Sequence, residues 1–319
     1  MQFSEDIKDR AAGVLLGQAI GDALGVPYEF AAPVQAGQAE MIGGGLGDYE
    51  PGEWSDDTQM AVCIARVGAT GADLTGVEAL DAIGQAFLDW KQSGPADIGA
   101  QTSTVLAWAA RDDGAGLSER MTALSTELAR QGRAGNGGLM RTAVVGLAGL
   151  DSAGHTAEAA RRVCALTHAN PDCVDSAVLW SLAVRQAVVA GTLDVRSGLA
   201  YLPEDRRDWW EQKLDAAEAD PPETFRSNGY TVTALQAAWA SIHATRELTG
   251  PEQVPAALQL AISIGNDTDT VAAIAGGLLG AHYGASQLPR DWVEKVHGWP
   301  GLRAEDLIQL GLAVAQSRS

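Results

Sequence analysis

Two short acidic clusters are the parts of the 319-residue sequence best suited to chemistry. One runs from Trp54 to Thr58 and the other from Gly265 to Thr270. Apolar residues at helical spacing follow each cluster, which predicts that each lies at the N-terminus of a helix. Capping of a helix start requires one Ser, Thr or Asp oxygen, so capping alone is a first explanation of each cluster.

Metal binding is a second explanation, because each cluster has more carboxylates than a cap needs. Asp56 and Asp57 in one cluster, like Asp267 and Asp269 in the other, would repel each other unless a cation neutralised them. Oxygen ligands with no nearby His or Cys favour hard cations such as Mg²⁺ or Mn²⁺ over zinc. Four carboxylates can hold two ions about 3.5 to 4 Å apart, the separation typical of two-metal hydrolytic sites.

A glycine-rich loop is the third candidate. It comprises Gly135, Asn136, Gly137 and Gly138. It is predicted to lead into an apolar helix over residues 139–150, whose N-terminal N–H groups could bind an anion. Arg133 or Arg141 could supply positive charge there. A plain turn explains the loop equally well, and its spacing matches neither the P-loop nor the dinucleotide fingerprint.

Three single residues have both structural and functional explanations. Glu29 lies in an apolar run, where an unpaired carboxylate is costly to bury, so we expect it to face a cleft. Asp97 could cap a helix beginning near Ile98 or belong to the site. His168 is either a satisfied core histidine or a ligand-binding one.

The elements that must position these residues are predicted to be helices throughout. Apolar residues recur at helical spacing almost everywhere, strand-like alternation is nearly absent, and glycine and proline separate the helices. Gly13, Gly17, Gly21 and Gly25 form a stripe that a neighbouring backbone can approach closely. The polar stretch 194–223 is either a linker or a surface helix. A site built from both ends of the chain predicts one domain over residues 1–319.

Composition excludes several classes of function. A net charge of −19 opposes binding to nucleic acid and to anionic membranes. No apolar run approaches the roughly 20 residues of a membrane span, and the N-terminal stretch lacks the basic flank of a secretory signal. An odd count of 3 cysteines without a CxxC pair argues against disulfides and zinc. We expect a soluble cytoplasmic protein.

Taken together, the motifs resemble those of the ADP-ribosylglycohydrolase family, which includes dinitrogenase reductase-activating glycohydrolases. The resemblance spans nearly the whole chain, and seven segments match in the right order. They are Gly17 to Gly25 with Glu29 and Phe30, Trp54 to Thr58, Gly94 to Gly99 with Thr102, Gly135 to Arg141, Thr167 to Pro171, Asn228 to Val232, and Gly265 to Thr270 with Gly276 to Gly284.

The resemblance implies a compact orthogonal bundle of α-helices with a site for two Mg²⁺ or Mn²⁺ ions. The implied metal ligands are Ser55, Asp56, Asp57, Asp267, Asp269 and Thr270. It further implies that the glycine-rich loop cradles a diphosphate and that His168 and Tyr230 line the substrate cleft. Gly138 departs from the family pattern, in which serine is frequent at this position.

The implied reaction is hydrolysis at the anomeric carbon of the ribose in ADP-ribosylated protein or a small ADP-ribosyl conjugate, with release of ADP-ribose. The candidate catalytic carboxylates are Glu29, Asp56 and Asp97, and Glu29 or a metal-bound aspartate would accept the proton. An arginine side chain is the favoured leaving group. The alternatives are an inactive structural protein that binds ADP-ribose or metal, similar to some lens crystallins, and a dimetal hydrolase of another nucleotide.

Overall fold

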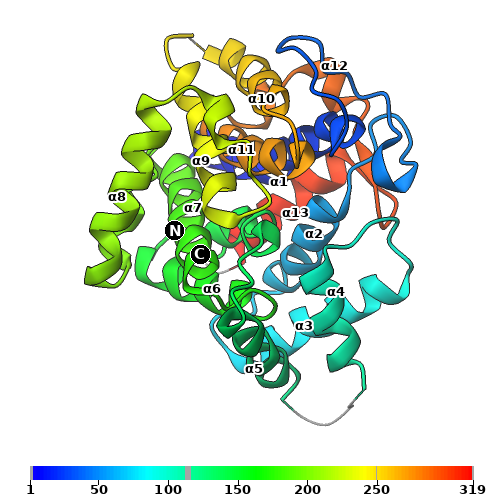
Figure 1. Cartoon of the computed structure of the whole chain (residues 1–319), viewed down its shortest axis with the longest axis vertical. Coiled ribbons are helices and arrows are strands. Elements are labelled where there is room, and N and C mark those ends of the chain that lie inside the picture. Colours follow the sequence, from blue (N-terminus) through cyan, green and yellow to red (C-terminus); the bar gives the residue numbers. More distant parts are fainter. Residues whose placement is uncertain (1–2, 112–115, 249, 318–319) are drawn as a thin grey trace.

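The computed structural model describes residues 3–111, 116–248 and 250–317, in which almost all the regular secondary structure is helical (Figure 1). The α-helices are α1 (Glu5–Gly25), α2 (Asp56–Gly68), α3 (Val77–Gln92), α4 (Ala100–Ala109), α5 (Leu117–Arg130), α6 (Ala153–Ala165), α7 (Pro171–Ala190), α8 (Glu204–Ala219), α9 (Thr231–Ala244), α10 (Gln253–Ser263), α11 (Thr268–Tyr283), α12 (Arg290–Val293) and α13 (Ala304–Gln316). One hairpin, β1 (His297–Gly298) with β2 (Leu302–Arg303), is the only sheet in these residues. The prediction of an all-α fold is confirmed.

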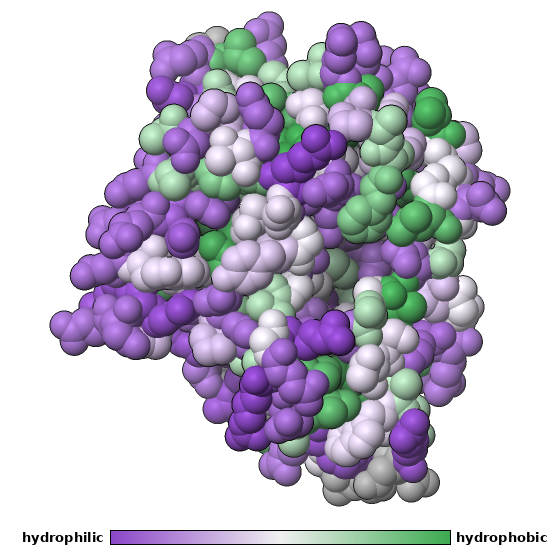
Figure 2. Space-filling view, in the orientation of Figure 1, coloured by the Kyte–Doolittle hydropathy of each residue, from purple (hydrophilic) through white to green (hydrophobic). Residues whose placement is uncertain are grey.

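Short 3-10 helices connect these elements. They are η1 (Val26–Tyr28), η2 (Gly45–Gly47), η3 (Asn136–Gly138), η4 (Ala143–Leu147), η5 (Arg196–Tyr201), η6 (Pro222–Phe225), η7 (Gly250–Glu252) and η8 (Ala285–Gln287). The stretch that the sequence leaves open as linker or surface helix contains α8, which packs on α9. On the face drawn in Figure 2, hydrophilic residues predominate and hydrophobic ones form small groups.

The centre of the fold is the contact between α1 and α11, which lie side by side (Figure 1). The glycine stripe of α1 makes this contact possible. A Cβ built on Gly17 would lie 2.3 Å from the Gly276 carbonyl oxygen, and one on Gly13 would lie 2.2 Å from that of Gly280. Both distances are far below van der Waals contact, so the two backbones pack at a distance that only glycine permits.

This contact brings the start of α11 to the end of α1. Thr268 Oγ1 donates a hydrogen bond of 2.9 Å to the Gly25 carbonyl, and Gly25 packs against the backbone of Asp269. The second acidic cluster is thereby fixed beside residues more than 200 positions earlier in the chain.

The predicted helix over residues 139–150 is wrong. This segment forms turns and the short η4, and all its residues are buried. The carbonyl of Thr142, which an α-helix would use internally, accepts a hydrogen bond of 2.9 Å from Ser181 Oγ of α7. Gly146 meets the same neighbour, since a Cβ there would lie 2.6 Å from the Ser181 carbonyl oxygen. Tertiary contact with α7 therefore replaces the local helical pattern.

Helix α7 is the one described helix that is long and apolar enough to cross a membrane, and 72% of its apolar window is buried inside the fold. The side chain of Asn170 caps the start of α7, and the helix packs against α6, α9 and α11. Its apolar character is thus accounted for by its place in the core.

Candidate active site

The first acidic cluster is held in place by a carboxylate of α1. Both oxygens of Asp22 accept hydrogen bonds from the first turn of α2: Oδ1 from Ser55 N (2.9 Å) and Ser55 Oγ (2.8 Å), and Oδ2 from Thr58 N (3.0 Å) and Thr58 Oγ1 (2.6 Å). Ser55, the N-cap residue of α2, makes no capping bond itself. Asp22, which is not part of α2, therefore caps the start of this helix, and capping does not account for the carboxylates of Asp56 and Asp57.

The second acidic cluster is positioned by two asparagines. Asn228 Oδ1 accepts from Asp267 N at 3.1 Å, and its Nδ2 donates to the Gly265 carbonyl at 2.9 Å. Asn136 Nδ2 donates to Asp267 Oδ2 at 2.8 Å. Asp267 is the N-cap residue of α11 but makes no side-chain cap. Capping thus does not explain the carboxylates of either cluster.

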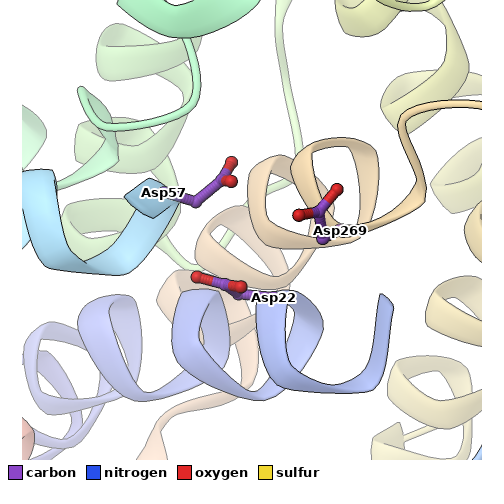
Figure 3. A group of neighbouring side chains, drawn as sticks. All are labelled: Asp22, Asp57 and Asp269. Atoms are coloured by element: carbon purple, nitrogen blue, oxygen red, sulfur yellow. The ribbon is translucent and has the colours of Figure 1, made fainter. Parts of the chain in front are cut away.

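The two clusters meet in two groups of three carboxylates. Asp22, Asp57 and Asp269 form one group and Glu29, Asp267 and Asp269 the other, each with ligand atoms within 4.8 Å of one another. Figure 3 shows the first group converging from α1, α2 and α11. Asp269 belongs to both groups, so it is the residue best placed to touch two cations.

The donor set fits a divalent metal. Two buried carboxylate oxygens, Asp57 Oδ1 and Asp269 Oδ1, have no hydrogen-bond partner among the described residues. Ser55 Oγ lies 3.2 Å from Asp57 Oδ2 and 3.4 Å from Asp269 Oδ2, and Thr270 Oγ1 lies 3.4 Å from Asp57 Oδ2. Carboxylate and hydroxyl oxygens are the ligands that Mg²⁺ and Mn²⁺ prefer. This buried acidic cluster could hold metal.

Burial and mutual repulsion raise the pKa values of these carboxyl groups. Burial raises the pKa of Asp22 to about 6, and burial together with the charge of Asp267 raises that of Glu29 to about 9. The pKa values of Asp56, Asp57 and Asp269 are raised well above their usual range, first by burial and then by neighbouring carboxylates. The cluster cannot be fully ionised at neutral pH without a compensating cation.

Beside the carboxylates lies a cleft of about 910 Å³, within the usual size range of ligand-binding sites. Of the predicted site residues, those that line it are Glu29, Asp56, Asp97, Gly135, Asn136, Gly137, His168, Tyr230, Asp267, Asp269 and Thr270. Ser55, Asp57 and Gly138 do not line it. Asp97 does not cap α4, whose N-cap residue is Gly99. Its charge instead acts on Asp56, as the strongest of the repulsions that raise the pKa of that carboxyl.

The glycine-rich loop also lines the cleft, includes η3 and reaches the acidic residues through Asn136. Backbone hydrogen bonds tie it to the start of α9, from Asn136 N to the Gly229 carbonyl (3.2 Å) and from Thr231 N to the Ala134 carbonyl (3.1 Å). A Cβ on Gly138 would lie 2.5 Å from Cys164 Sγ. Cys164 therefore fills the space that a side chain at position 138 would need, which explains why serine is not found here.

Sequence comparison agrees with this geometry. The sequence profile of the ADP-ribosylglycohydrolase family matches residues 4–318. The chain is a member of the ADP-ribosylglycohydrolase family. Like the other members it is a hydrolase, and the resemblance noted in the sequence is confirmed.

The named activities of individual relatives differ. An ADP-ribosylarginine hydrolase, Tri1 of Pseudomonas putida, is 31% identical over 302 residues, covering 92% of this chain and 75% of the relative. ADP-ribosyl-[dinitrogen reductase] glycohydrolase of Rhodospirillum rubrum is 29% identical, with 91% of each chain covered. Human ADP-ribosylhydrolase ARH3 is 26% identical, covering 91% of this chain and 90% of the relative. A solved structure of an ADP-ribosylglycohydrolase-related protein complex superposes with a TM-score of 0.75 at 26% identity, covering 99% of this chain and 100% of the other.

Asp22 is a functional residue that the motifs do not predict, although the sequence carries a signal for it. Asp22 is a fully buried carboxylate inside the apolar run of α1. An unpaired carboxylate among apolar neighbours is costly to bury, at Asp22 as at Glu29. The glycine stripe around Asp22 hides this signal, because it explains the segment as a packing surface.

Proposed function

We propose that this ADP-ribosylglycohydrolase cleaves the glycosidic bond at the anomeric carbon of ADP-ribosylated arginine, in a protein or a small conjugate, with two divalent cations. The observation that carries the proposal is that two carboxylate trios share Asp269 in a cleft that the glycine-rich loop also lines. Such a cleft offers cation ligands from its acidic residues, and the glycines of the loop let a diphosphate approach the backbone closely.

The residues that would hold Mg²⁺ or Mn²⁺ are Ser55, Asp56, Asp57, Asp267, Asp269 and Thr270. The cations would supply electrophilic polarisation of oxygen ligands and orientation of the sugar. Asp22 would keep Ser55 and Asp57 in position through the four hydrogen bonds it accepts from the start of α2. Asp269 would contact both ions, since it is the residue shared by the two trios.

Glu29 is the proposed proton acceptor. It lies half-buried at the cleft, directly after η1, next to Asp267 and Asp269. Its carboxyl has a pKa of about 9 in the metal-free protein because burial and the charge of Asp267 oppose ionisation. Positive charge at the trio would stabilise the carboxylate form, the form that accepts a proton from water during hydrolysis.

An arginine linkage is supported by the charge of the cleft. Glu29, Asp56 and Asp97 line it on the acidic side, where a guanidinium leaving group would find opposite charge. Two relatives with similar sequences are ADP-ribosylarginine hydrolases. We infer the same linkage for this chain.

Product analysis tests the proposal. The protein with Mg²⁺ or Mn²⁺ is offered ADP-ribosylarginine, an ADP-ribosylserine peptide and an acetyl ester of ADP-ribose. Release of intact ADP-ribose from the arginine conjugate is expected. Release of AMP or phosphate would assign a phosphoesterase instead, binding of ADP-ribose without turnover would assign a structural protein, and a preference for serine or ester would overturn the linkage.

A further inference from the structure

Three buried side chains form a connected line beneath the glycine-rich loop. Arg141 Nη2 donates a hydrogen bond of 2.6 Å to Thr167 Oγ1, which lies 2.8 Å from His168 Nδ1. Arg141 and Thr167 are fully buried, and His168 is 2% exposed. The sequence suggests Arg133 or Arg141 as a source of positive charge at the loop; Arg133 lines the cleft, whereas the fully buried Arg141 does not.

The guanidinium of Arg141 has an unusual environment for a buried cation. Its neighbours are the Phe87 ring, 4.7 Å from Cζ, and Met60 Sδ, 3.7 Å from Nη1, and its Nε has no hydrogen-bond partner among the described residues. None of its hydrogen bonds to the described residues goes to a carboxylate. A buried cation without an ionic partner is costly, so a role beyond packing is expected.

Hydrogen-bond counting fixes the proton on His168. Thr167 Oγ1 accepts from Arg141, because a guanidinium has donors only. The single hydroxyl proton of Thr167 has no other acceptor among the described residues, so it points to His168 Nδ1. Nδ1 is then an acceptor, and a neutral imidazole carries its proton on Nε2. If Nδ1 carried the proton, the buried hydroxyl proton would have no partner, which is costly.

The Nε2 atom of His168 faces the cleft. A Cβ built on Gly137 would lie 3.1 Å from Nε2, and one on Gly135 would lie 3.8 Å from it. No hydrogen bond to Nε2 is formed by the residues described in the structure. A single N–H donor from His168 is therefore available to a ligand on the loop.

We propose that Arg141 and Thr167 are positioning residues that hold neutral His168 as its Nε2–H tautomer, so that its ring presents a hydrogen-bond donor to an anionic group on the glycine-rich loop. Burial and the adjacent guanidinium lower the pKa of His168 to about 3, which agrees with a neutral ring. The identity of the anion as the diphosphate of ADP-ribose rests on the proposed function. The tautomer itself does not.

Nitrogen NMR of ¹⁵N-histidine-labelled protein tests the tautomer without any ligand. The His168 signal, identified by its loss in His168→Gln, is expected to show a protonated Nε2 and an unprotonated Nδ1. A protonated Nδ1 in the parent protein would overturn the proposal. In Thr167→Val, which removes the hydroxyl at nearly constant volume, a mixture of tautomers is expected, and Thr167→Ser should restore the parent spectrum.

Calorimetric titration with ADP-ribose in the presence of Mg²⁺ tests whether the fixed His168 donor contributes to ligand affinity. Loss of the fixed donor in Thr167→Val should weaken binding about tenfold, the effect of one hydrogen bond to a charged group. Thr156→Val, which also removes a buried hydroxyl (hydrogen-bonded to the Gly149 carbonyl), should keep the parent affinity. Unchanged affinity of Thr167→Val would overturn the proposal.

A double-mutant cycle separates positioning from general packing. Gln at position 168 carries an amide N–H near the Nε2 position and has no tautomers. In the His168→Gln background, Thr167→Val should therefore have little further effect on affinity. An equal loss in both backgrounds would mean that Thr167 acts through packing and would contradict the proposal. A parent protein with the Nε2–H tautomer that binds no ADP-ribose would contradict the proposed function while supporting the tautomer.

Discussion

At the scale of single residues, Asp22 and Asp269 are two buried aspartates with different surroundings. Asp22 uses both oxygens to accept four hydrogen bonds, whereas Asp269 Oδ1 has no partner among the described residues. A carboxylate saturated by N–H and O–H donors supports a helix start, and one with a free buried oxygen is poised for a cation. The two residues should therefore respond differently to the same substitution.

Asp269→Asn should remove metal and activity while leaving the metal-free fold almost unchanged. Asn keeps the size of the side chain but loses one anionic oxygen. Turnover should fall about a hundredfold or more, comparable to the loss of one major electrostatic contributor. Metal content by mass spectrometry and release of ADP-ribose are the measurements. Asp306→Asn, at the start of α13, is the control, because Asp306 accepts from Arg303 N and serves as a cap alone.

Full activity and full metal content in Asp269→Asn would remove Asp269 from the site. The control variant Asp306→Asn is expected to keep full activity and full metal content, since Asp306 lies at an exposed helix start outside the cleft.

Gly137→Val should block binding of ADP-ribose without unfolding the protein. A Cβ at this position would lie 2.9 Å from His168 Cε1, so the ring or the loop must shift, and the larger side chain would occupy the cleft. Equilibrium dialysis with ADP-ribose measures the loss. Gly154→Val in α6 is the matched control, because no atom lies within 4 Å of a Cβ built there. Native affinity in Gly137→Val would mean that the loop is only a turn.

At the scale of elements, the starts of α2 and α11 were predictable and their neighbours were not. Each acidic cluster precedes a helical apolar pattern, and the helices begin at Asp56 and Thr268, inside the clusters. The sequence could not show that Asp22 caps α2, since that contact joins residues far apart in the chain. It also predicted a helix over 139–150 that contact with α7 prevents. A local sequence pattern thus predicts a helix correctly when the backbone hydrogen bonds of that helix form within it. The pattern fails when the backbone bonds to another element instead, as Thr142 does to α7.

Asp22→Asn should destabilise the start of α2 even without metal. The amide offers one acceptor oxygen in place of two, and its N–H₂ would face the donors of Ser55 or Thr58. Loss of hydrogen bonds to a charged group should lower the free energy of unfolding by about 1.5 to 3 kcal/mol. Urea unfolding in the presence of chelator measures this.

The control for Asp22→Asn comes from the same helix. Asp9 also accepts from a backbone N–H and a hydroxyl, those of Ser286 at η8, but in an exposed position. Asp9→Asn should therefore cost less. Equal stability of metal-free Asp22→Asn and the parent would show that Asp22 does not hold the start of α2.

At the scale of the whole molecule, stability should depend jointly on metal and pH. The folded metal-free protein holds carboxyl groups with pKa values raised to about 6 (Asp22) and about 9 (Glu29), against about 4 when unfolded. Between these pH values the folded state therefore binds more protons than the unfolded state. The contribution of these two carboxyl groups to stability is greatest below pH 4 and is lost as pH rises through their folded pKa values. A cation bound to the ionised carboxylates offsets this loss.

Thermal unfolding with and without chelator should therefore give a gap in Tm that widens from about pH 5 to pH 9. Calorimetry in buffers of different ionisation enthalpy should also detect protons released when Mn²⁺ binds. A gap in Tm that is absent, or constant over this pH range, would argue against metal at the carboxylate trios.

The contact between α1 and α11 also bears on how the protein is made. Because α11 packs along the glycine stripe of α1, every contact between them joins the first 25 residues to residues beyond 267. During translation, α1 leaves the ribosome long before α11 has been synthesised. The apolar surface of α1 therefore stays exposed until α11 packs against it. Contacts so distant in sequence also slow folding. The carboxylate trios, which need Asp269, can form only after the start of α11 has been synthesised, so a nascent chain has no assembled acidic site until residue 269 has emerged.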